Sequence, residues 1–380
     1  MKKFAVSFFV LALTVTVFGT VFARSNNDPT GANNGKDRFE ITMEDLAGED
    51  QDGNPLKPQG SNAYSVLQSR VAVAASNVLA DEVANVVLDN SGNYTFFKKQ
   101  GSNAGDIEDR VGLTMYIKAF GGMEKLDMKD YTKFETNYYG VVVGLDTDRK
   151  YGDNFDATYG LFVSYAGSQL KEEDYDDDKF SANSGFAGVR GNWYIGKLFF
   201  GAVLDYGYMA NKVEYKGGRG EDYSKDYNIQ SIGFAAKAGY NFEVVERSFT
   251  IQPNVVFNSN YLITEEYSSY DMIFGNEAKV KADNIIDIAV APGLKLAKTL
   301  GKCWIISAEG KYVFVSSNGD IKLETDYASG TLPETYYKDY VSCGLGVEKI
   351  WGYTVLHLKG HKTFCGRDGY VVNAGIEFKF

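Results

Sequence analysis

The last eleven residues, Tyr370-Val-Val-Asn-Ala-Gly-Ile-Glu-Phe-Lys-Phe380, alternate between apolar and polar or small side chains. Successive side chains of a β-strand point to opposite faces, so one face here carries Tyr370, Val372, Ala374, Ile376, Phe378 and Phe380. A transmembrane barrel strand needs this arrangement, because its outer face meets lipid and its inner face lines a polar lumen. The edge strand of a soluble sandwich shows the same alternation, so the rest of the chain has to decide.

The first 23 residues have the three regions of a secretory signal peptide. Lys2 and Lys3 form a basic start, residues 4–21 form an apolar run, and small residues follow it. We therefore expect cleavage between Ala23 and Arg24. A membrane-anchored signal is the alternative, because the run approaches the length of a spanning helix. The sequence has no second uncharged run of that length, so the mature chain would cross a membrane with strands.

The composition bounds the class of protein. The chain has 380 residues, with 27 Tyr, 25 Phe and 41 Gly but only 6 Pro, which is typical of a β-rich protein. The net charge is −11, and loss of Lys2 and Lys3 leaves 37 basic and 50 acidic residues, a net charge of −13. This acidity argues against nucleic-acid binding, which requires basic patches. Three Cys and two His offer few ligands, and we expect no metal and no cofactor.

Two segments precede the strand-rich part of the chain. Residues 24–60 are rich in Asn, Asp, Gly and Glu, which predicts a short disordered surface segment. Residues 61–90 are a predicted linker helix that begins with the capping residues Ser61 and Asn62. Its roughly 26 uninterrupted residues would extend about 40 Å. Because most of them are small and no clean heptad is present, we expect a narrow, surrounded helix rather than a coiled-coil helix.

Twelve strands are predicted in residues 109–380, where the hydrophobic pattern has a period of two. One face of each strand is apolar and the other is polar or small; in the fifth strand, Leu198, Phe200 and Leu204 oppose Gly201 and Asp205. The predicted ranges are 109–120, 133–146, 154–168, 180–194, 197–212, 226–242, 248–263, 279–296, 301–315, 335–348, 352–363 and 367–380.

The connections between these strands alternate in length. Long, charged and Gly-containing connections are expected at residues 121–132, 169–179, 213–225, 264–278 and 316–334, with short turns between them. Outer-membrane barrels have short periplasmic turns and longer external loops, whereas a soluble sandwich has no reason to alternate loop length. The prediction is an all-β fold, a twelve-stranded antiparallel transmembrane β-barrel with one N-terminal helix plugging the lumen.

Three stretches resemble a known family. Gly140-Val-Val-Val-Gly-Leu-Asp146, Ile251-Gln-Pro253 and Val372-Asn-Ala-Gly-Ile-Glu-Phe-Lys-Phe380 are similar to elements of the second, seventh and terminal strands of autotransporter translocator domains, the barrels of type V secretion. The resemblance covers residues 61–380. It implies an outer-membrane barrel that translocates or anchors a short N-terminal segment at the cell surface and is not an enzyme. An outer-membrane pore or structural barrel without export function is the alternative.

In that family the helix lies in the barrel lumen and joins the exported segment to the first strand. A twelve-stranded barrel encloses a lumen that a narrow helix can fill. We therefore expect lumen-side basic residues to pair with acidic residues of the helix, Arg110, Lys118 and Arg190 with Asp81, Glu82 and Asp89. A water-filled lumen without specific pairs is the alternative. Only about 37 residues separate the signal from the helix, so the exported segment is unusually short for the family.

The resemblance also implies partners. In related proteins the barrel-assembly machinery recognises a terminal strand with apolar residues at alternate positions from the final Phe. That role would fall here on Tyr370, Val372, Ala374, Ile376, Phe378 and Phe380. The expected surroundings are the lipid bilayer and lipopolysaccharide, with periplasmic chaperones before insertion, and the expected state is a monomer.

Some members of the family release their exported segment by cyclisation of a linker asparagine, assisted by acids of the lumen. The corresponding residues here would be Asn77, Asn85, Asn90 or Asn93 with Asp205, Glu309 or Glu377. None of these asparagines is in the Asn-Asn pair of the self-cleaving relatives, so we assign no catalytic residue.

Three further features are interpreted as structural. His357 and His361 are predicted to face the lumen, which argues against a hydrolase acting on lipids. The acidic stretch 172–178 lacks the glycine and terminal glutamate of an EF-hand loop, so we interpret it as a solvated loop rather than a calcium site. Cys303 and Cys343 are predicted on opposite faces and Cys365 in the last hairpin, so no intramolecular disulfide is expected.

Overall fold

The computed structural model describes residues 38–40, 61–89, 112–127, 133–151, 155–172, 175–216, 222–245, 248–271, 276–282, 284–301, 303–319, 321–325, 329–332 and 338–380. All of them belong to one unit, Arg38–Phe380. The predicted signal cleavage site at Ala23 and Arg24, most of the segment 24–60 and the predicted lumen residue Arg110 lie outside the described residues.

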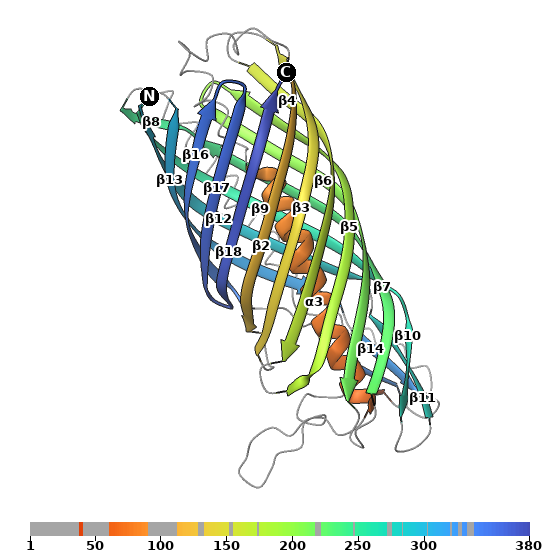
Figure 1. The fold of residues 1–380 in the computed structure, drawn as a ribbon. Helices are drawn as coiled ribbons and strands as arrows, with labels where there is room; N and C mark the ends of the chain where they lie inside the picture. Colours follow the sequence, from red (N-terminus) through yellow and green to blue (C-terminus); the bar gives the residue numbers. More distant parts are fainter. Residues whose placement is uncertain are drawn as a thin grey trace. The chain divides into compact units, whose positions relative to one another are not determined.

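Twelve antiparallel strands close into a barrel (Figure 1). Along the sheet the order is β12-β13-β16-β17-β18-β2-β3-β4-β5-β6-β7-β9, and β9 pairs back with β12. The predicted twelve-stranded barrel is therefore confirmed. The short β8 (Phe242–Val245) adds to β9. The strands of the barrel are β2 (Leu113–Asp127), β3 (Lys133–Lys150), β4 (Phe155–Glu172), β5 (Tyr175–Ile195), β6 (Leu198–Lys216), β7 (Asp222–Tyr240), β9 (Phe249–Thr264), β12 (Ile285–Leu300), β13 (Trp304–Asn318), β16 (Tyr340–Trp351), β17 (Thr354–Cys365) and β18 (Arg367–Lys379).

The outward face of the barrel is apolar, as the alternation of the terminal strand predicted. On β18, Tyr370 and Val372 are 63% and 50% exposed, whereas Val371 and Glu377 are buried. Many exposed aromatic side chains lie toward the two ends of the strands and many exposed aliphatic ones lie between them, as in a lipid-facing band with two interfacial girdles. Examples are Trp351, Tyr353 and Phe380 at the end with short turns, Tyr139, Tyr165 and Tyr208 toward the other end, and Leu161, Val163 and Leu358 between them.

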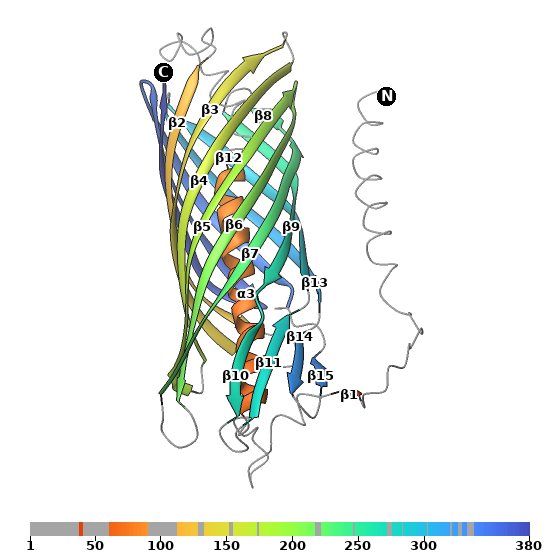
Figure 2. The same ribbon diagram turned by 90° about the vertical axis from the view of Figure 1, so that its right-hand side faces the viewer.

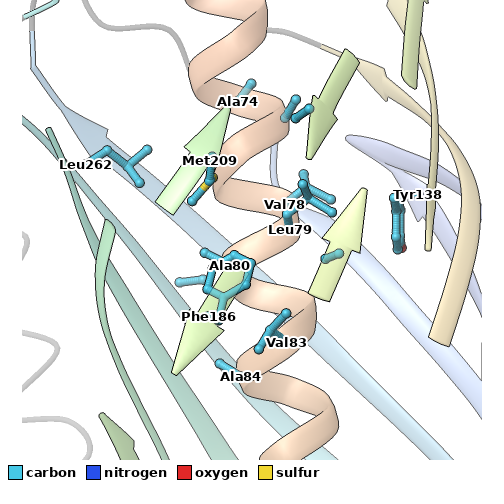
Figure 3. Packing of buried hydrophobic residues seen from close by; sticks show 14 of the residues in the cluster. Ala74, Val78, Leu79, Ala80, Val83, Ala84, Tyr138, Phe186, Met209 and Leu262 are labelled. Carbon is cyan, nitrogen blue, oxygen red and sulfur yellow. The ribbon is translucent and has the colours of Figure 1, made fainter. Parts of the chain in front are cut away.

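The helix α3 (Ser61–Leu88) runs through the lumen (Figures 1 and 2). It packs most closely against β6 and β7. Its small residues permit this approach, and Figure 3 shows Val78, Leu79 and Val83 of the helix among Phe186 and Met209 of the barrel wall. The 28 residues correspond to about 42 Å of helix. Among the described residues, no helix combines the length and apolarity needed to span a bilayer.

Inward-facing rings lie over glycines of the neighbouring strand. A Cβ at Gly144 on β3 would lie 2.1 Å from Cζ of Tyr116 on β2, and one at Gly239 on β7 would lie 2.4 Å from Cζ of Phe199 on β6. Any side chain at these two positions would displace the ring. The glycines thus allow large aromatic residues to lie flat on the wall, which leaves the axis of the barrel free for the helix.

Several predicted loops are instead extensions of strands, so the predicted boundaries at that end of the barrel are wrong. β2 continues to Asp127, and β4 and β5 reach Glu172 and Tyr175. Charged residues led to the loop prediction, but they stand opposite one another across the strands, and opposite charges in such pairs stabilise a sheet. Examples are Asp368 opposite Lys125, Lys125 opposite Glu135, and Glu135 opposite Lys171.

Two predicted loops, part of a predicted strand and three residues of the segment predicted to be disordered, residues 24–60, form a second sheet, which we call the outer sheet. It has the order β1 (Arg38–Glu40), β15 (Ser329–Leu332), β14 (Ile321–Thr325), β11 (Asn276–Ala282) and β10 (Tyr267–Asp271). The single strand predicted at 279–296 is wrong, because the chain leaves β11 at Ala282 and enters β12 at Ile285. Both pieces alternate, so the sequence pattern did not reveal the break. Strands β10, β11 and β14 pack against α3 (Figure 2).

Candidate functional site

The C-terminal end of α3 is held by cations of the barrel wall. Nζ of Lys118 on β2 donates a hydrogen bond of 3.0 Å to the carbonyl oxygen of Val86, and Nη1 of Arg190 on β5 donates one of 2.9 Å to that of Val87. The last carbonyls of a helix have no partner within the helix and form the negative end of its dipole. Lysine and arginine at this position therefore stabilise the helix in the lumen.

Acidic residues of the helix form ion pairs with two other residues of the wall. Asp89 pairs with Lys359 on β17, and Glu82 lies 3.0 Å from Nη2 of Arg367 on β18. Arg367 is only 1% exposed and also pairs with Glu124 on β2. A guanidinium group with five donors can serve several acceptors at once, so Arg367 connects the helix to two strands of the wall.

Two tyrosines complete the surroundings of Arg367. Tyr340 on β16 accepts a hydrogen bond of 3.2 Å from Nη1, and Tyr138 on β3 both accepts one of 3.3 Å from Nη2 and donates one of 2.8 Å to Glu124. The cluster of Arg367, Glu82, Glu124, Tyr138 and Tyr340 therefore links α3 with strands β2, β3, β16 and β18. A buried pair gains from such satisfied geometry, because unpaired charge in the interior is costly.

A third set of polar contacts involves residues that lie about two to three turns before the C-terminal end of α3. Nδ2 of Asn260 on β9 lies 2.7 Å from Oδ1 of Asn77 and 2.9 Å from Oδ1 of Asp81. The two contacts of Asn260 fix the rotation of the helix about its axis, since Asn77 and Asp81 are four residues apart and share one face.

On β6, Asp205 is 96% buried, and neither of its oxygens has a hydrogen-bond partner among the residues that the structure describes.

The space left between helix and wall is small. A cavity of about 70 Å³ lies on the side of β12, β13 and β16–β18, lined by charged residues that include Asp89, Lys237, Glu309 and Arg367. This volume accommodates only a few water molecules. The helix therefore lies in the lumen with an apolar contact against β6 and β7 and a cavity with polar lining on another side.

The comparisons with known proteins agree with this architecture. The family model of the autotransporter β-domain matches residues 115–349, which is 235 of the 380 residues. The chain belongs to the autotransporter β-domain family. Such barrels reside in the outer membrane, and this chain is an outer-membrane autotransporter barrel.

Solved structures share the fold of this autotransporter β-domain. The transport unit of AIDA-I from Escherichia coli is 16% identical, with a TM-score of 0.57 over 74% of this chain and 99% of that one. The translocator domain of NalP from Neisseria meningitidis is 15% identical, with a TM-score of 0.56 over 73% and 92%. The β-domain of the Bordetella autotransporter BrkA is 15% identical, with a TM-score of 0.55 over 70% and 98%. A search of curated proteins gives no match.

The structure places the predicted lumen residues of this autotransporter β-domain as follows. Lys118 and Arg190 do contact the helix, but through its terminal carbonyl groups, while Arg190 forms its ion pair with Asp146 of β3. The helix acids Glu82 and Asp89 are instead paired by Arg367 and Lys359, which sequence reasoning missed. The alternation of side chains along the strand already predicted that Lys359 faces inward, but alternation alone does not give the height of a residue along the barrel.

The histidines and cysteines occupy the predicted positions with one exception. His357 and His361 face the lumen, and Nδ1 of His361 lies 3.4 Å from Glu309. Cys343 faces outward and Cys365 ends β17 at the last hairpin, but Cys303 precedes β13 in a turn rather than facing the lumen within a strand. Within the described ranges, no group of three or more His, Cys, Asp or Glu residues is arranged to hold a metal ion.

Two of the residues considered for self-cleavage, Asn85 and Glu309, line the same cavity beside the helix. Asn77 and Asn85 lie on the buried part of the helix, where side chains of β9 reach them, Asn260 at 2.7 Å and Asn258 at 3.4 Å. Glu309 is in the ion-pair group of Lys359 and His361. Asn90 and Asn93 lie outside the described residues.

Proposed function

We propose that this barrel translocates its own N-terminal segment, residues 24–60, and then anchors it at the cell surface through α3. The observation that carries the proposal is the course of the helix. Figure 2 shows that the helix passes the outer sheet at one end, and its last turn is bonded to Lys118 and Arg190 inside the barrel. A chain that enters the helix from residues 24–60 therefore starts at the outer-sheet end.

Protease treatment of intact cells tests this orientation. A protease-sensitive epitope is inserted near residue 50, and a matched copy is inserted in the short turn between β16 and β17, at Gly352. The first epitope is expected to be lost from intact cells, and the second only after the outer membrane is permeabilised. Protection of the first epitope in intact cells would overturn the proposal.

A pore without export function is the second candidate, and the small cavity beside the helix argues against an open one. Recording in planar bilayers distinguishes the two functions. With the helix seated, a cavity of about 70 Å³ predicts long closed periods, whereas a general pore gives steady conductance from the moment of insertion.

The remaining assignments belong to the same proposal. We infer that no part of the chain catalyses a reaction, and that the lipid contact is made by the exposed apolar band, with lipopolysaccharide around its outer edge. The barrel-assembly machinery and periplasmic chaperones would act before insertion, and the barrel would function as a monomer. Strand β18 supports the assembly role, because Tyr370 and Val372 are exposed on its outward face and Phe380 is exposed directly after it.

A further inference from the structure

The edge of the outer sheet is occupied by a piece of the N-terminal segment. Strand β1, residues Arg38–Glu40, pairs in parallel with β15, and Phe39 stands opposite Gly330. Without β1, β15 would present an unpaired row of backbone donors and acceptors. Addition of an extended peptide to such an edge is a general mode of peptide recognition, in which main-chain hydrogen bonds provide the attraction.

The register of β1 matches the pattern of the sheet that it completes. Across the sheet, the position of Phe39 is in one row with Gly330, Leu323, Val280 and Tyr267. A shift by one residue would move Phe39 into a row of charged positions, because the two faces of a strand alternate with a period of two. The row is apolar or small in all five strands, so the pattern of the sheet favours the observed register.

The neighbouring rows show complementary charge. Arg38 is in the row of Ser329, Glu324 and Lys279, so its nearest charged position is an acid. Glu40 is in the row of Thr331, Lys322 and Lys281, whose two charged positions are both basic. The strand positions of Arg38 and Glu324, and those of Glu40 and Lys322, are two strand spacings apart, about 10 Å, which is comparable to the screening length at physiological salt.

We propose that the outer sheet is the docking surface for the exported segment of this same chain, which binds by adding β1 as its edge strand. The inference rests on the proposed function, since residues 38–40 must reach the outer-sheet end. Three paired residues bind weakly alone, but 20 residues connect Glu40 to Ser61, and short tethers give effective concentrations in the millimolar range. The docked strand then fixes where the segment leaves the barrel.

Disulfide trapping in the full chain tests the proposal. In a variant with Cys303, Cys343 and Cys365 replaced by Ser, the pair Phe39→Cys with Gly330→Cys is compared with Phe39→Cys and Ser269→Cys, which lies on β10 at the opposite edge. Docking predicts rapid oxidation of the first pair on intact cells, at least tenfold faster than the second. Equal rates would mean an undocked, freely moving segment and would overturn the proposal.

A second variant tests whether trapping depends on the backbone pairing of β15. Thr331→Pro, added to the first pair, removes one backbone N–H from β15, so it is expected to slow trapping at least tenfold, while heat-modifiable migration on gels reports that the barrel still folds. A product of dimer size would overturn the proposal in favour of strand exchange between two copies. If export itself fails, neither pair oxidises and the epitope near residue 50 is also protected, which distinguishes that failure from loss of docking.

Discussion

Replacement of Arg367 by Met tests whether the buried ion pairs hold the helix in the lumen. The side chain is 1% exposed, and its guanidinium contacts Glu82 of α3 at 3.0 Å and forms a second pair with Glu124 of β2. Methionine has a similar length without the charge. Both carboxylates would therefore lose their cation while the packing volume is largely kept.

The expected loss of stabilising free energy has two parts. Removing one partner of a buried pair costs about 3–5 kcal/mol, because an uncompensated charge stays behind. The carboxylate of Glu124 stays in the wall whether the helix is seated or not, so only the coupling with Glu82 acts on the seating of α3. Coupling energies between groups in contact are about 0.5–3 kcal/mol. About 0.5–3 kcal/mol corresponds to a roughly 2- to 150-fold change in the ratio of seated to unseated helix.

Single-channel recording of the full chain measures this ratio as open against closed time. Arg367→Met is expected to increase the open fraction about 2- to 150-fold, and Glu82→Gln in the same background is expected to recover part of the loss by removing the unpaired carboxylate. Lys362→Met is the matched control, because Lys362 pairs with Asp368 in an exposed position where such pairs contribute about 0–1 kcal/mol. An unchanged open fraction in a folded Arg367→Met barrel would refute the reasoning.

Three further predictions concern the wall and the terminus. Gly144→Ala should destabilise the barrel by about 1–3 kcal/mol, measured by heat-modifiable migration, because its Cβ would lie 2.1 Å from an aromatic ring, whereas Gly185→Ala meets nothing within 4 Å and should be neutral. Asp205→Asn should stabilise by about 1–3 kcal/mol, because it replaces a buried carboxylate whose two oxygens have no hydrogen-bond partner among the described residues; a lower unfolding temperature would contradict this. Deletion of Phe380 should reduce the amount of assembled barrel severalfold in membrane fractions, and unchanged assembly would exclude its role as a recognition signal.

The barrel was predictable because its strands are recognised from the alternation of consecutive residues. Alternation in a stretch such as Tyr370–Phe380 is a property of consecutive residues, and it gives the face of each side chain without knowledge of its neighbours. The helix was predictable for a similar reason, since Ser61 to Leu88 contains neither Gly nor Pro and begins with capping residues. The predicted range 61–90 and the observed range Ser61–Leu88 differ by two residues.

The charged contacts of the lumen were not predictable by the same rule. The alternation of side chains places Lys118, Arg190, Lys359 and Arg367 equally on the inward face of the wall. Which of them pairs with an acidic residue of the helix also depends on the height of each residue along the tilted strands and on the rotation of the helix. Height follows from the strand register, in which Lys118 stands opposite Gly375 rather than any residue near it in sequence. Rotation follows from contacts such as that of Asn260 with Asn77 and Asp81, which involve a different strand.

The outer sheet was missed because charged residues indicate a loop within the bilayer but are compatible with a strand beyond it. A charged residue within a membrane strand is rare on the lipid side, so charged stretches such as 264–278 and 316–334 were interpreted as loops. Beyond the bilayer the penalty disappears, and alternating charged and apolar residues again form strands. The same argument applies to Arg38-Phe-Glu40, which continues in the sequence as Ile41-Thr-Met-Glu44. A segment with low hydrophobicity can therefore carry a strand, provided that a sheet edge such as β15 is available to receive it.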